Sequence, residues 1–466
     1  MSILDHKLYY FLGIGGIGMS ALARFFKHHG KDVRGYDKTR TPLCIELENE
    51  GISCHYEENA ESLETLLALY RKEEVLVVYT PAVPVHHSEY RYFGEKGYRI
   101  LKRSVVLGEI TRQYKTIAVA GTHGKTTTTT LITHLLHSAG LNCFAFMGGI
   151  SGNFNSNLLL GKTGMGDELF VVEADEYDRS FLTLEPHIAV ITSVDPDHLD
   201  IYGDAEHVRE SYSLFAAKVR PGGVLLVKKN VDNDLKLTEQ RLIYSLNLNT
   251  EYCAGSIRVE DGQFLYSIKS PVEDIHNVVL GLPGLHNVEN SVAAVAVAQQ
   301  FGLKGNDIRE ALRSFKGVKR RFDYRLRNAD CIYIDDYAHH PEELKATINS
   351  VRSLYPGKKI TGIFQPHLYS RTRDFVKEFA ESLDLLDECL LMEIYPAREE
   401  PLEGVNSAWL AGHMTKRETV KILNAEEILM HLKIKKPEVL LSMGAGDIDR
   451  LVQPITDCLK NELETN

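Results

Sequence analysis

The chain has 466 residues, of which 44% are hydrophobic, so it is long enough for about three domains of ordinary size. Its 64 acidic residues outnumber its 53 lysines and arginines, and the formal net charge of −11 argues against a protein that binds nucleic acid by electrostatic attraction. The apolar runs are also too short to cross a bilayer, which takes about 18 residues, since the run Val292–Ala298 ends after about seven.

Seven cysteines lie far apart without a C-x-x-C pair, which argues against a disulfide framework and against a zinc cluster. The apolar stretch after Lys7 could imitate a secretory signal, but glycines interrupt it at the spacing of a binding motif, which a signal peptide does not require. We therefore expect the protein in a reducing compartment, the cytoplasm.

Predicted strands and helices alternate from the start of the chain. A strand at Leu8–Ile14 is followed by a helix at Ser20–Gly30, a strand at Val33–Asp37 and a later strand at Val75–Tyr79. This pattern predicts an N-terminal α/β domain at residues 1–108.

The alternation continues through two further domains. The central domain, residues 109–316, has predicted strands from Thr116 and at Leu169–Val172, Ile188–Thr192 and Gly223–Val227. The C-terminal domain, residues 317–466, has predicted strands at Cys331–Ile334, Lys359–Phe364, Cys389–Ile394 and Val439–Met443. Strands joined by helices pair in parallel through right-handed crossovers, so we expect an α/β fold of three doubly wound, mostly parallel sheets with ligands at the strands' carboxyl ends.

A first glycine motif follows the first strand. Its glycines are Gly13, Gly15, Gly16 and Gly18, in the pattern G-x-G-x-x-G, and Asp37 ends the next strand. Such glycines let the backbone approach a diphosphate at a helix N-terminus, while the carboxylate can bind a ribose hydroxyl. The pattern leaves three alternatives open: a dinucleotide, a nucleotide sugar, or a tight turn without a ligand.

A second glycine motif, Gly121-Thr122-His123-Gly124-Lys125-Thr126, lies between a strand and a Thr-rich helix start. A loop of this kind wraps phosphates with backbone N–H groups, places Lys125 on the β- and γ-phosphates and lets the Thr126 hydroxyl reach Mg²⁺. The general P-loop pattern has a glycine where this chain has Val119, so the loop is a shortened variant. The alternative is a structural turn with a solvent-facing lysine.

Other chemistry-bearing residues follow later strands. Glu173 ends a predicted strand and suits Mg²⁺, whereas His198 is a less typical ligand, and either could be purely structural. Four less specific segments carry histidines, arginines and carboxylates: residues 286–290, 320–323, 335–341 and 365–373. Singly each suits a helix cap, a charge pair or a turn, but together they suit the binding of carboxylate and phosphate across a cleft.

The segments GTHGKTT, EADEYD, DPDHLD, HNVEN, RRFD, DDYAHHP and QPHLYSRTRD occur in the order and spacing of the Mur ligases, and the chain resembles this family from about Phe11 to Gly446. The resemblance implies an N-terminal Rossmann-like domain that binds UDP, a central P-loop ATPase-like domain and a C-terminal Rossmann-like domain. The motif versions most resemble the branch that joins L-alanine to the lactyl carboxylate of UDP-N-acetylmuramate, with ATP and two Mg²⁺ ions, or Mn²⁺, in peptidoglycan synthesis.

The resemblance also implies roles for individual residues. Gly13, Gly15, Gly16, Gly18 and Asp37 would bind the uridine nucleotide. ATP would be bound by Gly121, Thr122, His123, Gly124, Lys125, Thr126, Thr127, Asn290, Arg321 and Asp336. Thr126, Glu173 and His198 would hold metal, and Lys125, Glu173, His198 and Arg321 would be catalytic. Tyr337, His339, Arg371 and Arg373 would surround the incoming alanine.

Two positions depart from the family's patterns. Sister ligases often carry a carbamoylated lysine where this chain reads Ser211-Tyr212-Ser213-Leu214, so we predict none here. Alanine-adding members often have Arg where this chain has Leu368, so recognition of the alanine carboxylate should depend more on Arg371 or Arg373.

Three rival functions remain at this stage: a nicotinamide-dependent dehydrogenase, a ligase that recycles a preformed tripeptide, and a regulator that hydrolyses ATP. The expected partners are the two small-molecule substrates, in a monomer or weak homodimer, with no nucleic acid and no membrane span.

Overall fold

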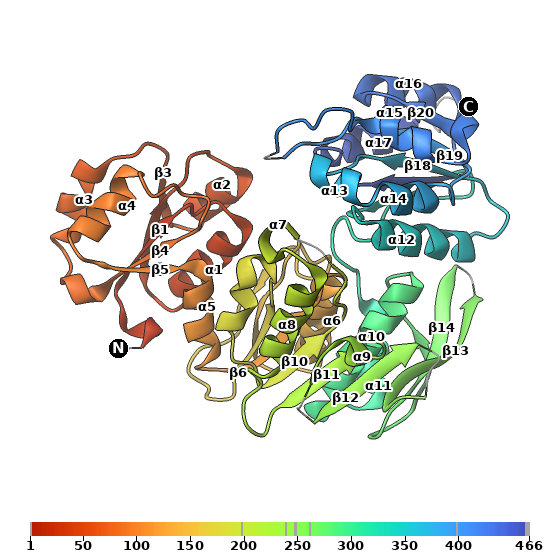
Figure 1. Cartoon of the computed structure of the whole chain (residues 1–466). Helices are drawn as coiled ribbons and strands as arrows, with labels where there is room; N and C mark the ends of the chain where they lie inside the picture. The colour runs from red at the N-terminus through yellow and green to blue at the C-terminus, as the bar shows by residue number, and fades with distance from the viewer. Residues whose placement is uncertain are drawn as a thin grey trace. The chain divides into compact units, whose positions relative to one another are not determined.

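The computed structural model describes residues 2–196, 199–237, 240–246, 249–260, 262–397 and 399–461 (Figure 1). The chain divides into two compact units. The first comprises Met1–Cys253, Lys269–Asp274 and Asn290–Ala311, and the second comprises Ala254–Ile268, Ile275–Glu289 and Leu312–Asn466.

The first unit begins with a five-stranded parallel sheet in the order β3-β2-β1-β4-β5. The strands are β1 (Leu8–Leu12), β2 (Asp32–Tyr36), β3 (Ser53–His55), β4 (Val75–Tyr79) and β5 (Arg99–Lys102). Every residue of β1 is buried, because alternate side chains enter two different cores: Tyr9 and Phe11 pack in one, and Leu8, Tyr10 and Leu12 in the other.

Helices supply the opposite walls of these two cores. The helices α1 (Ile17–His28) and α5 (Arg103–Thr111) contribute to the core of Tyr9 and Phe11, and α3 (Ala60–Leu67) and α4 (Ser88–Glu95) to the other. The helix α2 (Pro42–Asn49) follows β2. The sheet is therefore covered on both faces, as a doubly wound fold requires.

The first unit also contains seven neighbouring strands in the order β12-β11-β10-β6-β9-β7-β8. These are β6 (Lys115–Ala120), β7 (Cys143–Phe146), β8 (Leu158–Leu159), β9 (Leu169–Glu173), β10 (Ile188–Ile191), β11 (Val224–Lys228) and β12 (Arg241–Leu246). All adjacent pairs from β12 to β7 are parallel, and β7 with β8 is antiparallel. The helices with these strands are α6 (Lys125–Ser138), α7 (Leu199–Tyr202), α8 (Ala205–Ala216) and α9 (Val231–Asp234), with the 3-10 helix η3 (Tyr177–Thr183).

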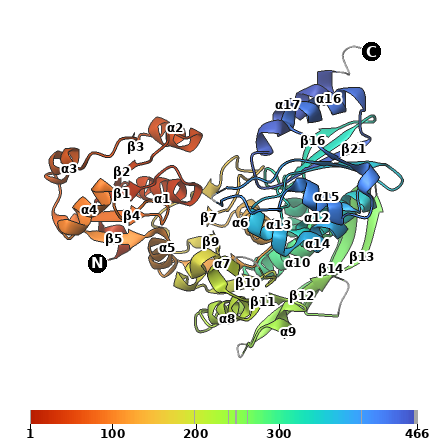
Figure 2. The same cartoon turned by 45° about the horizontal axis from the view of Figure 1, so that its top comes forward.

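In the second unit, six strands lie in the order β16-β17-β21-β18-β19-β20. They are β16 (Asp323–Arg327), β17 (Ile332–Asp336), β18 (Ile360–Phe364), β19 (Glu388–Leu391), β20 (Val420–Ile422) and β21 (Val439–Met443). All pairs are parallel except β16 with β17 at the edge. The helices are α12 (Pro341–Leu354), α13 (Tyr369–Asp374), α14 (Val376–Leu383), α15 (Ser407–His413), α16 (Ala425–Ile434) and α17 (Asp449–Asn461), several of which are labelled in Figure 2.

The predicted fold class, three α/β regions with mostly parallel sheets, is confirmed, and most predicted strands differ from the observed ones by a few residues at their ends. The pattern gave no indication of β13 (Tyr252–Glu260), β14 (Gln263–Lys269) and β15 (Ile275–Val279), of which β14 and β15 are antiparallel. The side chains of β14 alternate between buried and more exposed positions, and exposed positions also interrupt β13 and β15, so these strands lack the continuous apolar runs that mark the parallel ones. The helices α10 (Leu285–Gln300) and α11 (Gly305–Ser314) follow them.

Candidate functional site

A cavity of about 1150 Å³ lies within the first unit. Its walls include all four glycines of the first motif together with Asp37, and also Glu173 at the end of β9. The volume is slightly above the usual range for small-molecule sites, so the cavity can hold a ligand as large as a nucleotide sugar. The structure thus brings together the residues predicted for the uridine nucleotide and a residue predicted for metal.

Asp37 holds the first glycine loop in shape. Its Oδ2 accepts a hydrogen bond of 2.7 Å from the Gly15 backbone N–H, and its Oδ1 accepts one of 3.1 Å from Thr39. Gly13 has φ of +85°, which favours glycine, and a Cβ on Gly18 would lie 2.7 Å from Arg103 Nη1. Side chains at Gly13 and Gly18 are therefore excluded, the first by backbone conformation and the second by Arg103.

The second glycine loop joins β6 to α6. Gly124 has φ of +82° and caps α6, and a Cβ there would lie 2.8 Å from Asn290 Oδ1. The His123 backbone N–H donates to Ser193 Oγ at 2.7 Å, and the Thr122 hydroxyl donates to the Asp195 carbonyl at 2.8 Å. The loop is thus fixed by the segment after β10, and the Asn290 side chain lies beside Gly124.

Lys125 is engaged in an ion pair. Its Nζ lies 2.8 Å from Glu176 Oε1 and also donates to the Gly121 carbonyl at 2.6 Å. Both side chains are largely buried, with 14% of Lys125 and 4% of Glu176 exposed. Burial alone would lower the pKa of the lysine, but Glu176 and Glu173 raise it above its ordinary value, so Lys125 is an ammonium.

Two of the three residues predicted to hold metal, Thr126 and Glu173, lie on elements that the fold brings together. Thr126 and Thr127 are buried in the first turn of α6, and β6 is the neighbour of β9, which ends at Glu173. Glu173 Oε2 accepts a 3.0 Å hydrogen bond from Gly148. His198 lies outside the described residues. Among those that are described, no three His, Cys, Asp or Glu side chains form a metal-binding cluster.

In the second unit, Arg321, Tyr337 and His339 lie together. The Arg321 guanidinium is 4.9 Å from the Tyr337 ring centre, and the rings of Tyr337 and His339 are 5.3 Å apart. Arg320 and Phe322, on either side of Arg321, have φ of +62° and +51°, values that non-glycine residues rarely adopt. The strained backbone places the Arg321 side chain on this cluster.

Burial, with the charges of Arg371 and Arg321, lowers the pKa of His339 to about 4 although Glu343 opposes this effect. His339 is therefore neutral at neutral pH. Its Nδ1 lies 3.0 Å from the Tyr337 carbonyl, so that nitrogen carries the proton.

Asp336, at the end of β17, holds the neighbouring loops through both carboxyl oxygens. Oδ2 accepts from the Phe322 N–H at 2.7 Å and Oδ1 accepts from the Ala338 N–H at 2.8 Å. Burial raises the pKa of Asp336 to about 7, although Arg321 opposes the rise. A carboxyl group with this pKa can exchange a proton near neutral pH.

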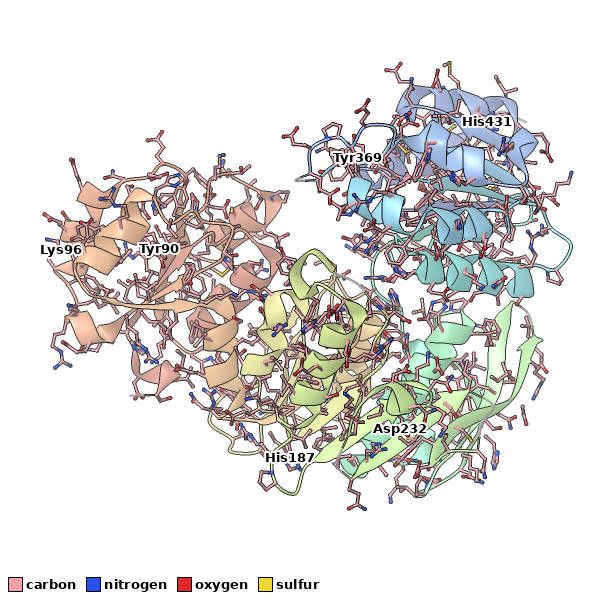
Figure 3. All side chains as sticks on the ribbon, in the orientation of Figure 1. Tyr90, Lys96, His187, Asp232, Tyr369 and His431 are labelled. Atoms are coloured by element: carbon pink, nitrogen blue, oxygen red, sulfur yellow. The ribbon has the colours of Figure 1, made fainter. Side chains whose placement is uncertain are left out.

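The two predicted alanine-binding arginines differ in position. Both are on α13, whose first residue Tyr369 is labelled in Figure 3. Arg371 is buried near His339, whereas Arg373 is half exposed and its Nε donates to Asp374 at 2.8 Å. The structure thus brings Arg371, but not Arg373, to the Tyr337 cluster. Leu368, before α13, has φ of +71°.

The sequence analysis missed two residues of the first unit that form ion pairs beside the glycine loops. One is Glu176, the partner of Lys125, and the other is Arg103, whose Nη2 lies 3.8 Å from Asp175 Oδ2. In the acidic segment EADEYD only Glu173 is predicted as a site residue, although three further carboxylates follow this strand end beside the P-loop lysine. That spacing was the available signal for Glu176.

None of the helices in the described ranges is long and apolar enough to cross a membrane.

Comparison with known proteins matches three family models along the chain: "Mur ligase family, catalytic domain" at residues 8–115, "Mur ligase middle domain" at 119–298 and "Mur ligase, glutamate ligase domain" at 320–446. A curated protein of Cytophaga hutchinsonii named UDP-N-acetylmuramate–L-alanine ligase is 47% identical over 96% of this chain and 95% of its own. One of the same name from Parabacteroides distasonis is 48% identical over 97% of both chains.

Solved structures share the fold. The UDP-N-acetylmuramate-alanine ligase of Thermotoga maritima superposes with a TM-score of 0.78 at 24% identity, covering 98% of this chain and all of that one. A murein peptide ligase of Psychrobacter arcticus gives a TM-score of 0.67 at 23% identity over 98% of this chain and 99% of its own. With full-length relatives at nearly half identity and family models along most of its length, the chain belongs to the Mur ligase family and is an ATP-dependent ligase.

Proposed function

We propose that this ligase joins L-alanine to the lactyl carboxylate of UDP-N-acetylmuramate and releases ADP and phosphate, a step of peptidoglycan synthesis in the cytoplasm. The observation that carries the proposal is the cavity lined both by the first glycine loop and by Glu173. Its lining offers one ligand both a glycine loop suited to a diphosphate and a carboxylate on β9, the strand paired with β6. The names of the full-length relatives supply the amino acid.

A carboxylate is a poor electrophile, so it must be activated before an amine can attack it. In the proposed reaction the lactyl carboxylate attacks the γ-phosphorus of ATP, which gives an acyl phosphate and ADP. The alanine amine then attacks the acyl carbon, and inorganic phosphate leaves. Catalysis comes mainly from positioning and from neutralising charge, which we assign to Lys125 and Arg321.

We assign ATP binding to the second glycine loop, residues 121–127, and to Asn290, Arg321 and Asp336. Lys125 exchanges Glu176 for the phosphates when the nucleotide binds. Because both carboxyl oxygens of Asp336 already accept backbone hydrogen bonds, we propose that it meets the nucleotide only through its remaining lone pairs.

The residues predicted to hold metal have the chemistry to bind Mg²⁺, or Mn²⁺ in its place. Glu173 lines the cavity and Thr126 is in the first turn of α6, and their carboxylate and hydroxyl oxygens are donors of the kind that a hard cation prefers. We propose that they hold the metal together with His198. Bound there, the ion supplies positive charge to the phosphate oxygens.

For the amino acid, we propose Tyr337, His339 and Arg371 as the binding group, with Arg371 pairing with the alanine carboxylate. Arg373 is proposed only as a weaker contributor, since its guanidinium is occupied by Asp374. The neutral His339 suits a site for an amine, because a charged imidazole would repel the ammonium form of alanine.

The test offers ATP, Mg²⁺ and UDP-N-acetylmuramate with each amino acid separately, and measures phosphate and product mass. We expect phosphate release and a mass increase by one alanine residue. With ¹⁸O in the lactyl carboxylate, the label should appear in the released phosphate. Ligation of a tripeptide but not of alanine would favour the recycling activity, and hydride transfer to a nicotinamide without phosphate release would favour the dehydrogenase.

A further inference from the structure

The turn that leads to Arg321 contains a residue that its backbone conformation does not favour. The Arg321 backbone N–H donates a 3.0 Å hydrogen bond to the Val318 carbonyl, which closes a four-residue turn over residues 318–321. The third residue of this turn, Arg320, has φ of +62°. Glycine or asparagine usually occupies such a position, because a Cβ makes a positive φ costly. An arginine there indicates that its side chain makes contacts that offset this cost.

The Arg320 guanidinium joins the carboxyl ends of two neighbouring strands. Its Nε donates to Asp335 Oδ2 at 3.1 Å, in β17, and its Nη2 donates to the Gly444 carbonyl at 2.8 Å, directly after β21, which is labelled in Figure 2. The side chain of Arg320 is 21% exposed and that of Asp335 is 0% exposed, so the ion pair is largely shielded from water. Salt screens such a pair much less than a surface pair, so it can hold the turn in one position.

Asp335 is itself fixed by the sheet. Its other carboxyl oxygen, Oδ1, accepts a 2.7 Å hydrogen bond from the Ser442 hydroxyl, and Ser442 is the residue paired with Asp335 in the parallel register of β17 and β21. The Ser442 oxygen also lies 3.0 Å from the Tyr333 hydroxyl oxygen. The guanidinium is therefore attached to a carboxylate of the sheet and not to one of a loop.

The position of Arg320 also determines where its neighbours lie. The Arg320 carbonyl accepts a 2.7 Å hydrogen bond from the Tyr337 N–H, and its guanidinium is 5.3 Å from the Tyr337 ring centre. The Arg321 guanidinium lies 4.9 Å from the centre of the same ring. Arg320 thus connects the end of the sheet to the two residues that we assign to ATP and to alanine.

We propose that Arg320 is a positioning residue of the ligase: its ion pair with Asp335 and its hydrogen bond to Gly444 fix the turn over residues 318–321, so that Arg321 is held where the phosphates of ATP bind. Arg320 itself does not bind the nucleotide. This inference deepens the proposed function and rests on the role that it assigns to Arg321.

The first test removes the Arg320 side chain while favouring the turn. In Arg320→Gly/Asp335→Asn, glycine accepts the positive φ without strain, and asparagine leaves no unpaired charge in the sheet. This variant should fold like the wild type, as judged by circular dichroism, but its kcat for alanine-dependent phosphate release should be at least tenfold lower. A wild-type kcat would overturn the proposal, because the turn alone would then be sufficient.

The second test asks whether Arg320 acts through Arg321. Arg320→Lys keeps a positive charge for Asp335, but a lysine lacks the planar fork that reaches the carboxylate and the Gly444 carbonyl together. With saturating substrates and enough enzyme to follow slow turnover, Arg320→Lys should lower kcat about tenfold when Arg321 is present and less than twofold in the Arg321→Ala background. An equal loss in both backgrounds would overturn the proposal.

Arg352→Lys is the matched control. Arg352 also donates to a carboxylate and to a backbone carbonyl of the second unit, Asp387 at 2.9 Å and Leu385 at 2.6 Å, but it belongs to no proposed site. Its kcat should equal that of the wild type, and a loss as large as that of Arg320→Lys would overturn the proposal. A wild type without alanine-dependent phosphate release would overturn the proposed function as well, whereas the other outcomes overturn this inference alone.

Discussion

Lys125 and Glu176 form the most consequential pair of side chains in the first unit. Each is buried, and each is the charged partner of the other at 2.8 Å. Removing one member of such a pair leaves the other charge buried without compensation, which typically costs about 3–5 kcal/mol. A substitution of Lys125 therefore changes both the stability of the fold and the rate of catalysis, and an experiment has to separate the two effects.

The double variant separates them. Lys125→Ala should lower the free energy of unfolding by about 3 kcal/mol and reduce alanine-dependent phosphate release by orders of magnitude. Adding Glu176→Gln removes the buried charge, so Lys125→Ala/Glu176→Gln should recover most of the stability and none of the turnover. Circular dichroism during urea unfolding and a phosphate assay measure the two quantities. Near wild-type ligation by either variant would show that the P-loop assignment is wrong.

His339 gives the second unit a dependence on pH. Its pKa is lowered from the ordinary 6.5 to about 4, so between these values the unfolded chain binds a proton that the folded chain does not. Stability should consequently rise with pH across this window and be complete above pH 6.5, with a contribution from His339 of up to about 3 kcal/mol. In His339→Gln the loss of stability on acidification should be smaller.

The sole tryptophan, Trp409 on α15, belongs to the second unit and reports its unfolding by fluorescence. Urea titrations at pH 4.5, 5.5 and 7 compare the two proteins. An equally steep acid dependence in both would mean that other groups, and not His339, control the pH response of this unit.

At the scale of elements, strand ends and the loops after them carry the site. Glu173 ends β9, and its carboxylate lies against Gly148, where a Cβ would come within 2.3 Å of Oε2. Gly148→Ala should therefore displace the carboxylate and raise the Mg²⁺ concentration needed for half-maximal phosphate release about tenfold or more, if Glu173 is a metal ligand. The metal titration of initial rates measures this shift.

The matched control is Gly94→Ala. Gly94 lies in α4, and a Cβ there meets no atom within 4 Å. Alanine at this position should leave the metal dependence unchanged and stabilise the helix by about 0.5–1 kcal/mol. The same Mg²⁺ requirement in Gly148→Ala and wild type would contradict a metal role for Glu173.

The elements also explain which parts of the molecule could be predicted from sequence. Parallel strands such as β4 are buried on both faces, so they are apolar runs with clear ends. The two glycine loops could be predicted from the sequence because the backbone geometry at several of their positions excludes residues other than glycine. The role of Glu176 could not be predicted, because it depends on a contact with Lys125 across 51 residues of sequence. The strands β13–β15 could not be predicted either, because exposed positions interrupt their apolar residues. The role of Asp37 in holding Gly15 likewise needed the structure, since the sequence indicated only a ribose contact.

At the scale of the molecule, the predicted ligand sites divide unequally between the two compact units. The cavity that we propose for the uridine nucleotide lies wholly in the first unit. The residues proposed for ATP come from both: the second glycine loop and Asn290 from the first, Arg321 and Asp336 from the second. Binding of the two nucleotides should therefore leave different footprints along the chain.

Hydrogen exchange followed by mass spectrometry reads these footprints peptide by peptide. UDP alone should slow exchange in peptides that contain residues 13–18, 37–41 and 84–88, and should leave the second unit unchanged, because ligand binding suppresses the local opening of the segments that it contacts. A non-hydrolysable ATP analogue with Mg²⁺ should protect residues 121–127 and, in addition, 320–339. Protection confined to residues 121–127 would show that Arg321 and Asp336 do not bind ATP. The second unit would then contribute only to the binding of the amino acid.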